Sequence, residues 1–223
     1  MPALPLSLSL MLLMSATASY AASSITLPEP RLQSGYSVEE ALQNRRSVRQ
    51  FSSAPVSLRD LGQLLWAAQG ITSERGFRTA PSAGALYPLE IHVLAGNVDG
   101  LSTGTYRYQP EHHALVGIRN DDQRSALAAA AAQQTWLSEG AVVLVFSTVS
   151  RRTESKYGRR SERYILIEVG HAAQNVFLQA QSLALATAVI GAFRDNEVAE
   201  LLELPRGERP IYLMPVGHAR RPH

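Results

Sequence analysis

The sequence of 223 residues has no cysteine, and this absence excludes disulfide bonds, thiol nucleophiles and metal sites built on cysteine. Lysine is nearly absent as well, because 20 of the 21 basic residues are arginine and Lys156 is the single lysine. Charge is almost balanced at a formal net charge of +2, which is too small for a nucleic-acid footprint. Folding stability must therefore come from packing, and no nucleic-acid partner is expected.

Several catalytic and cofactor motifs are also missing. The sequence has no G-x-S-x-G nucleophile elbow, no phosphate-binding loop ending in Gly-Lys and no G-x-G-x-x-G fingerprint after a strand. None of the six histidines belongs to an H-x-x-x-H or H-E-x-x-H arrangement, so no metal site is predicted. His112 and His113 fall in a predicted turn and are expected to be solvated, whereas His171 is expected to be packed or hydrogen-bonded within a helix.

The first 22 residues differ from the rest of the chain. They carry no charged side chain, contain an apolar run over residues 4–14 and end in small residues that suit a signal peptidase. We therefore expect a cleaved export signal over residues 1–22 and a periplasmic or extracellular location. The basic segment that usually precedes the apolar run is missing, so a retained anchor or lipid-proximal helix stays open. No later stretch reaches about 20 consecutive apolar residues, and no stable membrane span is expected after cleavage.

The rest of the chain shows a mixed pattern of helices and strands. Ser37 and Glu40 form a capping box at the start of a predicted helix over residues 37–46, and Ser57 and Gly70 bound a second helix with an apolar stripe. Further elements are predicted as strands at 89–96, 141–149 and 210–217, a hairpin around Pro110 at 104–118 and an alanine-rich helix at 121–137. The middle strand is so continuously apolar that both of its faces should be covered.

The longest predicted element is a helix over residues 163–189. Apolar and small residues recur along it at helical spacing, namely Ile165, Val169, Ala172, Ala173, Val176, Phe177, Ala180, Leu183 and Ala184. Such a helix can lie at the centre of the fold and can also pack against a partner chain. The order of elements lacks strict βαβ alternation, so one α+β domain is expected.

Two short stretches carry candidate binding chemistry. NRRSVRQF at residues 44–51 offers three arginine side chains around a serine hydroxyl, which suit a phosphate or the polar edge of a heterocycle. TAPSAGALYPLEIHV at residues 79–93 places small residues and two prolines before a strand, so its backbone can approach a flat ligand closely. Each stretch also has an ordinary interpretation, as a solvated helix end and as a loop that leads into a strand.

Five motifs in one order carry a resemblance to a known family: RRSVRQF, PSAGALYPLE, KYGRRSERYILIEVGHAAQN, AVIGAF and LMPVGH. Over residues 35–218 the chain resembles the nitroreductase superfamily, in particular its SagB-type (thiazole/oxazole oxidase-like) dehydrogenase branch. The resemblance implies an FMN-dependent α+β domain over residues 35–220, with a mixed sheet surrounded by helices and a long central dimer helix. It also implies a homodimer with non-covalently bound FMN in a groove between the subunits.

The resemblance further assigns cofactor contacts to individual residues. The phosphate, ribityl chain and pyrimidine edge of FMN would be held by Arg45, Arg46, Ser47 and Arg49. The isoalloxazine would lie along Pro81, Ser82, Ala83, Gly84 and Ala85, and its redox-active edge would face the backbone at Ile190 and Gly191. An additional phosphate contact would come from Arg220 or Arg221. Ala85 stands where many classical nitroreductases carry asparagine, and this difference favours the SagB-like branch.

Lys156 and Tyr157 match the Lys-Tyr pair that azoline-oxidising members of this branch use to move protons while the flavin accepts hydride. Arginine stays protonated at any workable pH, whereas a desolvated lysine can lose its proton and act as a base. We therefore interpret the pair as catalytic. The alternative is chance, because the surrounding arginine-rich segment is a solvated cationic site where lysine or arginine would serve equally well.

The predicted activity is a two-electron redox reaction in two half-reactions at one flavin, on a small organic or peptide-derived substrate. The electron donor is either reduced nicotinamide, NAD(P)H, or an organic substrate with an acidic C–H bond, and the kinetics are expected to be ping-pong. Export would separate the enzyme from the cytosolic nicotinamide pool and favours an extracytoplasmic donor. Two other classes stay open, a flavin- or small-molecule-binding module without turnover and a structural envelope protein.

Overall fold

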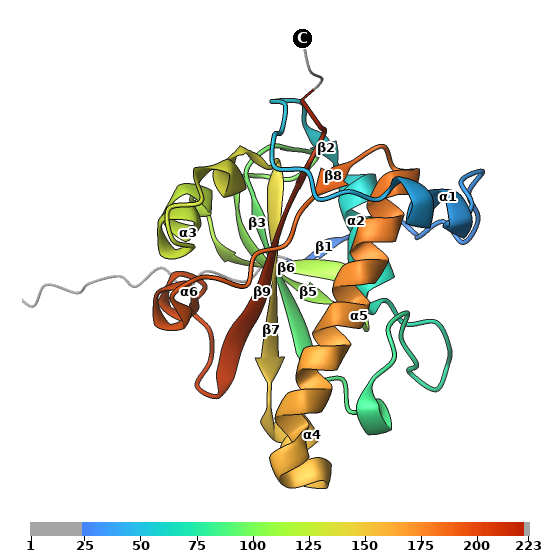
Figure 1. The fold of residues 1–223 in the computed structure, drawn as a ribbon, viewed down its shortest axis with the longest axis vertical. Coiled ribbons are helices and arrows are strands. Elements are labelled where there is room, and N and C mark those ends of the chain that lie inside the picture. Colours follow the sequence, from blue (N-terminus) through green and yellow to red (C-terminus); the bar gives the residue numbers. More distant parts are fainter. Residues whose placement is uncertain (1–23, 221–223) are drawn as a thin grey trace, which may run out of the picture.

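A computed structural model describes residues 24–220 (Figure 1), so the predicted export signal lies outside the described residues. Seven strands form one sheet in the order β1-β6-β5-β3-β7-β9-β8, and each pair in it is antiparallel. The strands are β1 Ser24–Thr26, β3 Leu89–Ala95, β5 Gly104–Gln109, β6 Ala114–Arg119, β7 Val142–Val149, β8 Ala186–Thr187 and β9 Glu208–Gly217. A separate parallel pair is formed by β2 Val56–Ser57 and β4 Val98–Asp99.

Helices cover both faces of this sheet (Figure 1). The α-helices of the described residues are α1 Val38–Asn44, α2 Leu58–Gln69, α3 Arg124–Ala130, α4 Arg151–Tyr157, α5 Ser161–Ser182 and α6 Asp195–Leu201. One core cluster joins α2 and α5 to one sheet face, and a second joins α3 and α6 to the other. The expected α+β fold with helices around the sheet is confirmed. Within residues 24–220, no helix combines the length and apolarity needed to cross a membrane.

Strand β7 shows why its sequence is continuously apolar. Leu144 and Phe146 belong to the core cluster under α2 and α5, whereas Val143 and Val145 belong to the cluster under α3 and α6. All four side chains are fully buried. Because alternate side chains of a strand point to opposite faces, a central strand covered on both sides must be apolar at every position. The prediction that both faces of this strand are covered is confirmed.

The helix starts predicted from capping residues are confirmed. Ser37 caps α1 by accepting from the backbone N–H of Glu40, while the Glu40 carboxylate accepts from the N–H of Ser37 at 2.8 Å. Ser57 caps α2, which ends at Gly70 as predicted. Gly70 has an ordinary negative φ of −63°, however, so the left-handed backbone usual for a terminal glycine is not the reason for it. A Cβ there would lie 2.1 Å from the ring of Trp66, which packs over the glycine instead.

Two predicted helices are shorter in the structure. The alanine-rich helix ends at Ala130, because Ala132 and Gln133 adopt positive φ angles and break it before a 3-10 turn, η2 Thr135–Glu139. The long helix α5 spans 22 residues and ends at Ser182. The stretch up to Val189, which the periodicity assigned to this helix, instead turns back and adds β8 to the sheet edge. The predicted apolar face up to Ala180 is buried as expected.

Candidate active site

The arginine-rich segment at residues 45–49 follows α1 and runs beside strand β8. The backbone N–H of Val48 donates to the carbonyl of Thr187 at 3.0 Å. Ile190 and Gly191 lie just beyond this strand, in the segment that crosses the front of the sheet toward α6 in Figure 1. The structure thus brings the predicted phosphate-binding segment close in the fold to the predicted redox-edge residues. Ile190 is buried and Gly191 is exposed.

Arg220 lies beside the same segment. Its backbone N–H donates to the carbonyl of Gln50 at 3.0 Å, and its guanidinium donates to the carbonyl of Phe51 at 3.2 Å. The other edge of the guanidinium pairs with Glu139 at 3.0 Å. Arg220 therefore lies beside the predicted phosphate-binding segment, and its guanidinium is already paired with Phe51 and Glu139. Arg221 lies outside the described residues.

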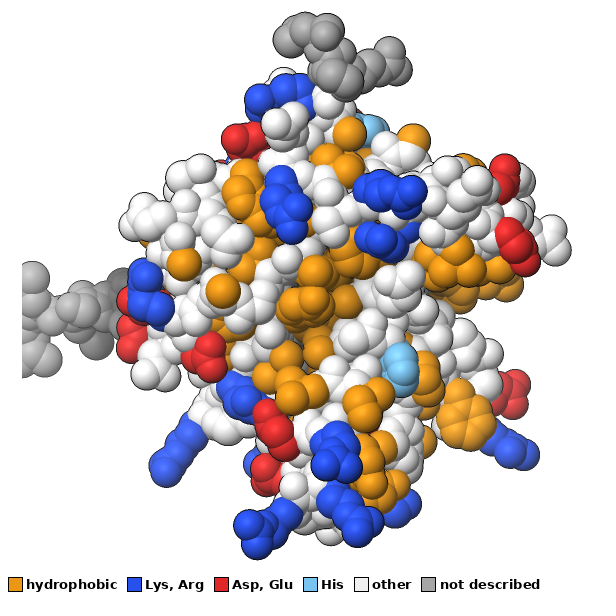
Figure 2. All heavy atoms as spheres, viewed as in Figure 1, with side chains coloured by type: hydrophobic (Ala, Val, Ile, Leu, Met, Phe, Trp, Pro, Cys, Tyr) orange, Lys and Arg blue, Asp and Glu red, His pale blue; other side chains and the backbone are white. Residues whose placement is uncertain are grey.

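The arginine side chains of segment 45–49 lie at the protein surface. Arg45 lies 5.2 Å from the centre of the Phe177 ring, and Arg49 lies 5.5 Å from the Trp136 ring. Arg46 is exposed and folds back onto backbone carbonyls of its own turn. Figure 2 shows the molecule from the same side as Figure 1, with hydrophobic side chains gathered at the centre and Lys and Arg side chains above and below them. A flat ring on the apolar centre and a phosphate on the cations would match this distribution.

The loop at residues 81–85 has an unusual backbone. Gly84, Ala85 and Tyr87 have φ angles of 64°, 54° and 44°, in the left-handed region that residues other than glycine and asparagine rarely adopt. The asparagine that many classical nitroreductases carry at the position of Ala85 would accept this backbone more easily. The strained loop must be held by its surroundings.

Glu168 on α5 stabilises this loop through its carboxylate. Its carboxylate accepts a hydrogen bond from the backbone N–H of Ala83 at 2.8 Å and another from the hydroxyl of Ser82. The side chain is buried, and burial raises the pKa of the carboxyl while these two hydrogen bonds partly oppose the rise. Sequence reasoning missed this residue. An ionisable residue three positions after Ile165 and four before Ala172, on the predicted apolar face, was the available signal.

Lys156 and Tyr157 end helix α4 and lie against the same loop. A Cβ built on Gly84 would lie 2.9 Å from the Tyr157 hydroxyl and 3.1 Å from Nζ of Lys156. Tyr157 is half-buried and packs edge-on against Tyr164, with ring centres 4.9 Å apart. The predicted catalytic pair is thus brought to the predicted flavin loop. The Lys156 side chain itself is exposed in the single chain, so the expected desolvation is not provided by this chain alone.

The predicted cofactor residues separate into two groups on helix α5. Glu168 anchors the loop group, whereas Phe177 lies beneath Arg45 of the arginine group. These two anchors are nine positions apart, which corresponds to roughly 13 Å along the helix axis and half a turn around it. The groups therefore face different sides of α5 within one chain. Both fit FMN chemically, since one offers cations and the other a close backbone approach at Gly84.

Two histidine predictions are wrong. His171 is exposed on α5, because it lies outside the buried stripe that includes Glu168 and Ala172. His113 is half-buried, and its two ring nitrogens contact the Tyr108 hydroxyl at 2.9 Å and a backbone carbonyl at 3.1 Å. Burial lowers the pKa of His113. Within the described part of the chain, no group of three or more His, Asp or Glu side chains lies in a position to hold a metal ion.

Comparison with known proteins places this arrangement in a family. The Nitroreductase family model matches residues 42–218, which contain both groups of site residues. The chain belongs to this family. The protein MJ1384 of Methanocaldococcus jannaschii, whose name assigns it to the nitroreductases, is 48% identical over 180 residues, or 81% of this chain and 90% of that protein. A solved structure of a protein named as a nitroreductase, from Ralstonia eutropha, superimposes with a TM-score of 0.78 at 31% identity and covers 89% of this chain and 90% of the other.

More distant relatives indicate the chemistry. The microcin B17-processing protein McbC of Escherichia coli is 30% identical over 132 residues, or 57% of this chain and 48% of McbC. An FMN reductase of Bacillus subtilis named for NAD(P)H is 24% identical over 195 residues, or 81% of this chain and 65% of the reductase. The chain thus spans about half of McbC. Membership of this family, with flavin reductases among the relatives, supports a flavin-dependent oxidoreductase.

Proposed function

We propose that the protein is an FMN-dependent oxidoreductase of the SagB-type dehydrogenase branch, which carries out two-electron ping-pong redox chemistry on a small organic or peptide-derived substrate. One observation carries the branch assignment. The single lysine and its neighbour Tyr157 lie against Gly84 of the small-residue loop, as a proton-moving pair beside a flavin would. The similarity to a microcin-processing protein supports a peptide-derived substrate.

In this proposal the protein holds FMN through its two groups of residues. The arginines of segment 45–49, Ser47 and Arg220 bind the phosphate and the polar edges, and Ile190 and Gly191 border the ring. The loop at residues 81–85, anchored by Glu168, covers the ring from the other side. FMN, when bound, supplies the hydride chemistry, and the protein supplies orientation and proton delivery.

The two groups act together in a homodimer. Because they face different sides of α5 in one chain, a single flavin contacts both only if a second copy contributes one of them. Apolar side chains on the outer surface of α5 support such an interface, since Leu166 and Ile167 are each 49% exposed. A second copy packed against this region would also shield Lys156 from solvent.

The electron donor and location follow from the predicted export signal. An enzyme outside the cytoplasm takes electrons from its organic substrate or from an extracytoplasmic donor. A cytoplasmic enzyme has NAD(P)H available, as the name of the Bacillus reductase suggests for that protein. Amino-terminal sequencing of the protein isolated from its native host distinguishes these cases, because cleavage near residue 22 supports export.

The first test is the visible spectrum of the purified protein, followed by acid release and identification of any chromophore. We expect one FMN per chain. A colourless protein that takes up no added FMN would contradict the proposal. Steady-state oxidation or reduction of quinones, nitroarenes or azoline peptides then separates an enzyme from a flavin-binding module, which binds FMN without turnover.

A further inference from the structure

A polar pocket of about 500 Å³ lies behind the loop that carries the proposed flavin contacts. Charged side chains dominate its walls, which include Arg78, Arg107, Arg152, Glu90 and Glu111. Three arginines face two glutamates, so the walls carry one excess positive charge. Its volume is in the range of sites for small organic ligands.

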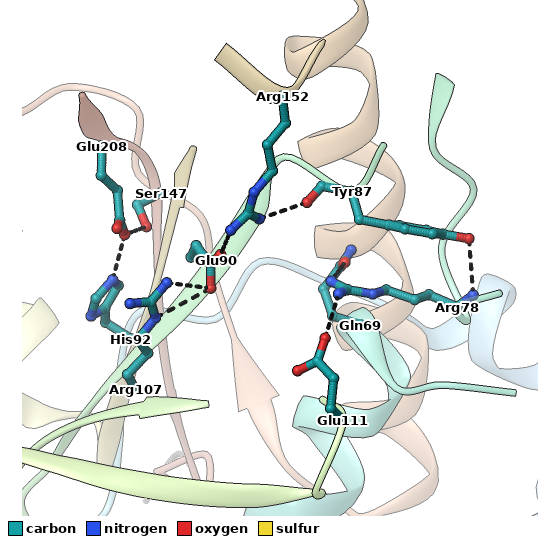
Figure 3. Close-up of polar contacts among 10 residues, drawn as sticks. All are labelled: Gln69, Arg78, Tyr87, Glu90, His92, Arg107, Glu111, Ser147, Arg152 and Glu208. Carbon is teal, nitrogen blue, oxygen red and sulfur yellow. Dashed lines mark hydrogen bonds and ion pairs between the residues drawn. The ribbon is translucent and has the colours of Figure 1, made fainter. Parts of the chain in front are cut away.

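Glu90 organises one side of the pocket (Figure 3). Its side chain is only 11% exposed and pairs with Arg107 at 3.0 Å and with Arg152 at 2.5 Å. Two cations thus share one carboxylate, and this cluster accounts for the excess positive charge. Since a partly buried charge is costly unless it is paired, the cluster is suited to accept one more negative group.

Arg78 organises the other side (Figure 3). Its guanidinium lies 4.6 Å from the centre of the Tyr87 ring, donates to Gln69 at 3.0 Å and pairs with Glu111 at 3.2 Å. The side chain is 11% exposed, and its Nε is buried without a hydrogen-bond partner among the described residues. An unsatisfied buried donor is unfavourable, so a ligand acceptor that reached it would be stabilising.

The pocket adjoins the proposed reaction site through helix α4. Arg152 donates to the carbonyl of Tyr87 at 2.9 Å, while Lys156, four positions later on the same helix, lies against Gly84. Positions four apart are neighbours on one helix face, about 6 Å from each other. The loop that contains Gly84 and Tyr87 therefore contacts Lys156 at Gly84 and lines the pocket at Tyr87.

We propose that this pocket binds a carboxylate group of the substrate and so selects singly charged anionic substrates. The proposal rests on the proposed function, because it makes the pocket a subsite of that active site. The single excess positive charge is balanced by one monoanion. A phosphate dianion would exceed it and would also meet the two glutamates. Arginine pairs with a carboxylate in a planar, two-pronged geometry that an amide or ester does not reproduce.

Two pairs of compounds that differ only in this charge test the proposal. Calorimetry compares the binding of benzoate with that of benzamide, and turnover compares 4-nitrobenzoate with 4-nitrobenzamide. We expect about a tenfold or larger preference for the carboxylate in Kd and in kcat/KM, the effect of one charge-assisted hydrogen bond. Equal binding of benzoate and benzamide overturns the proposal, as does displacement of benzoate by sulfate, a dianion, at lower concentration than by acetate.

Two variants that change the charge of the pocket in opposite directions provide the internal control. Arg107→Gln removes the excess positive charge, and we expect it to abolish the preference. Glu111→Gln adds to that excess and frees Arg78, so benzoate should bind several-fold more tightly. Arg206→Gln changes an exposed arginine outside the pocket and should leave both ligands unaffected. A structural defect would not move benzoate affinity in opposite directions, and equal effects of the first and third variants contradict the assignment.

The calorimetric readout separates this proposal from the proposed function. If the protein binds benzoate with the expected pattern but neither binds FMN nor reduces nitroarenes, the carboxylate site is supported and the proposed enzymatic function is contradicted. If it reduces 4-nitrobenzoate and 4-nitrobenzamide equally well, the enzymatic function is supported and the carboxylate site is contradicted.

Discussion

The carboxylate of Glu168 and the backbone N–H of Ala83 form a 2.8 Å hydrogen bond across 85 positions of the chain. This bond ties the middle of α5 to a loop whose backbone is strained at Gly84 and Ala85. The loop carries the proposed ring contacts, and the proposed proton-moving pair lies against it. A buried acid thus holds in place the loop to which the proposal assigns the ring contacts.

Replacing Glu168 by glutamine and by alanine should give different results. The amide oxygen of Glu168→Gln can still accept from Ala83 and Ser82, so we expect FMN affinity to stay within a few-fold of wild type. Glu168→Ala removes the partner of the half-buried Ala83 N–H, which costs about 1–3 kcal/mol of unfolding free energy. Fluorescence titration with FMN and urea unfolding measure the two effects. Equal FMN affinity in both variants would show that the hydrogen bond does not position the loop.

The titration of Glu168 should appear in the pH dependence of stability. Burial raises its pKa above the ordinary value of 4.5, so the folded protein holds this proton more tightly than the unfolded chain does. Stability from this group is complete below pH 4.5 and is lost as pH rises through the folded pKa. Subtracting the urea unfolding curves of Glu168→Gln from those of wild type isolates this decline. A difference that increases with pH would contradict the assignment.

Gly84→Ala tests the contact between the loop and the proposed catalytic pair, Lys156 and Tyr157. The new Cβ would lie 2.9 Å from the Tyr157 hydroxyl, so the tyrosine must move. Gly76→Ala is the matched control, because Gly76 has a similar φ of 74° but no atom within 4 Å of an added Cβ. Both variants should lose about 1 kcal/mol from backbone strain. Only Gly84→Ala should also reduce kcat, and a similar reduction in the control would refute the contact.

Lys156→Arg tests whether the single lysine serves as a base. Arginine keeps the positive charge but does not release a proton, so we expect normal FMN content with a loss of about 10²- to 10⁴-fold in turnover. Arg159→Lys, in the turn after α4, places a lysine nearby and should leave turnover unchanged. Stopped-flow reduction and reoxidation of the flavin assign the loss to one half-reaction. Full turnover in Lys156→Arg removes the proposed role.

The buried polar cluster of Glu208, His92 and Ser147 within the sheet predicts that the protein loses stability at acidic pH. Glu208 on β9 contacts Nε2 of His92 at 2.7 Å and accepts from the Ser147 hydroxyl at 2.5 Å (Figure 3). Burial alone would raise the pKa of Glu208, but these two hydrogen bonds and the electrostatic attraction of His92 and Arg107 together outweigh it and lower the pKa. The stability that they contribute is present above the ordinary pKa of 4.5 and is lost as pH falls through the folded pKa.

Ser147→Ala should therefore destabilise the protein by about 1.5–3 kcal/mol at neutral pH, the range for a hydrogen bond to a charged group. The difference from wild type should shrink as the pH falls below 4.5. Thr148→Val is the matched control on the same strand, because its hydroxyl is buried without a partner. Removing that hydroxyl should leave stability unchanged or increase it. Chemical unfolding at pH 7 and pH 4 measures all three proteins.

The sequence predicted the elements better than their three-dimensional arrangement. Capping residues located the starts of α1 and α2, because a cap is a local interaction. The order of the strands in the sheet was not accessible, since non-local pairing leaves no periodic signal. The end of α5 was misplaced for a related reason. Residues 183–189 keep an apolar pattern because they enter the sheet edge, not because they continue the helix.

For the candidate site, motif order proposed the residues but did not predict how the fold groups them. Nothing in the linear sequence indicates that the arginine segment and the loop at residues 81–85 face different sides of one helix. The exposure of His171 was predictable, because that position lies outside the buried stripe of its own helix. The pocket residues Glu90 and Arg107 were not predictable, because they come from two strands whose pairing the sequence does not reveal.

Helix α4 consists of seven residues and carries Arg152 at one turn and Lys156 at the next. Part of substrate choice and the proposed proton handling would therefore be inherited together, on one short helix. Among related proteins, divergence within this helix should alter selectivity and reaction type at the same time, whereas divergence at the positions of Arg107 or Glu111 should alter selectivity alone.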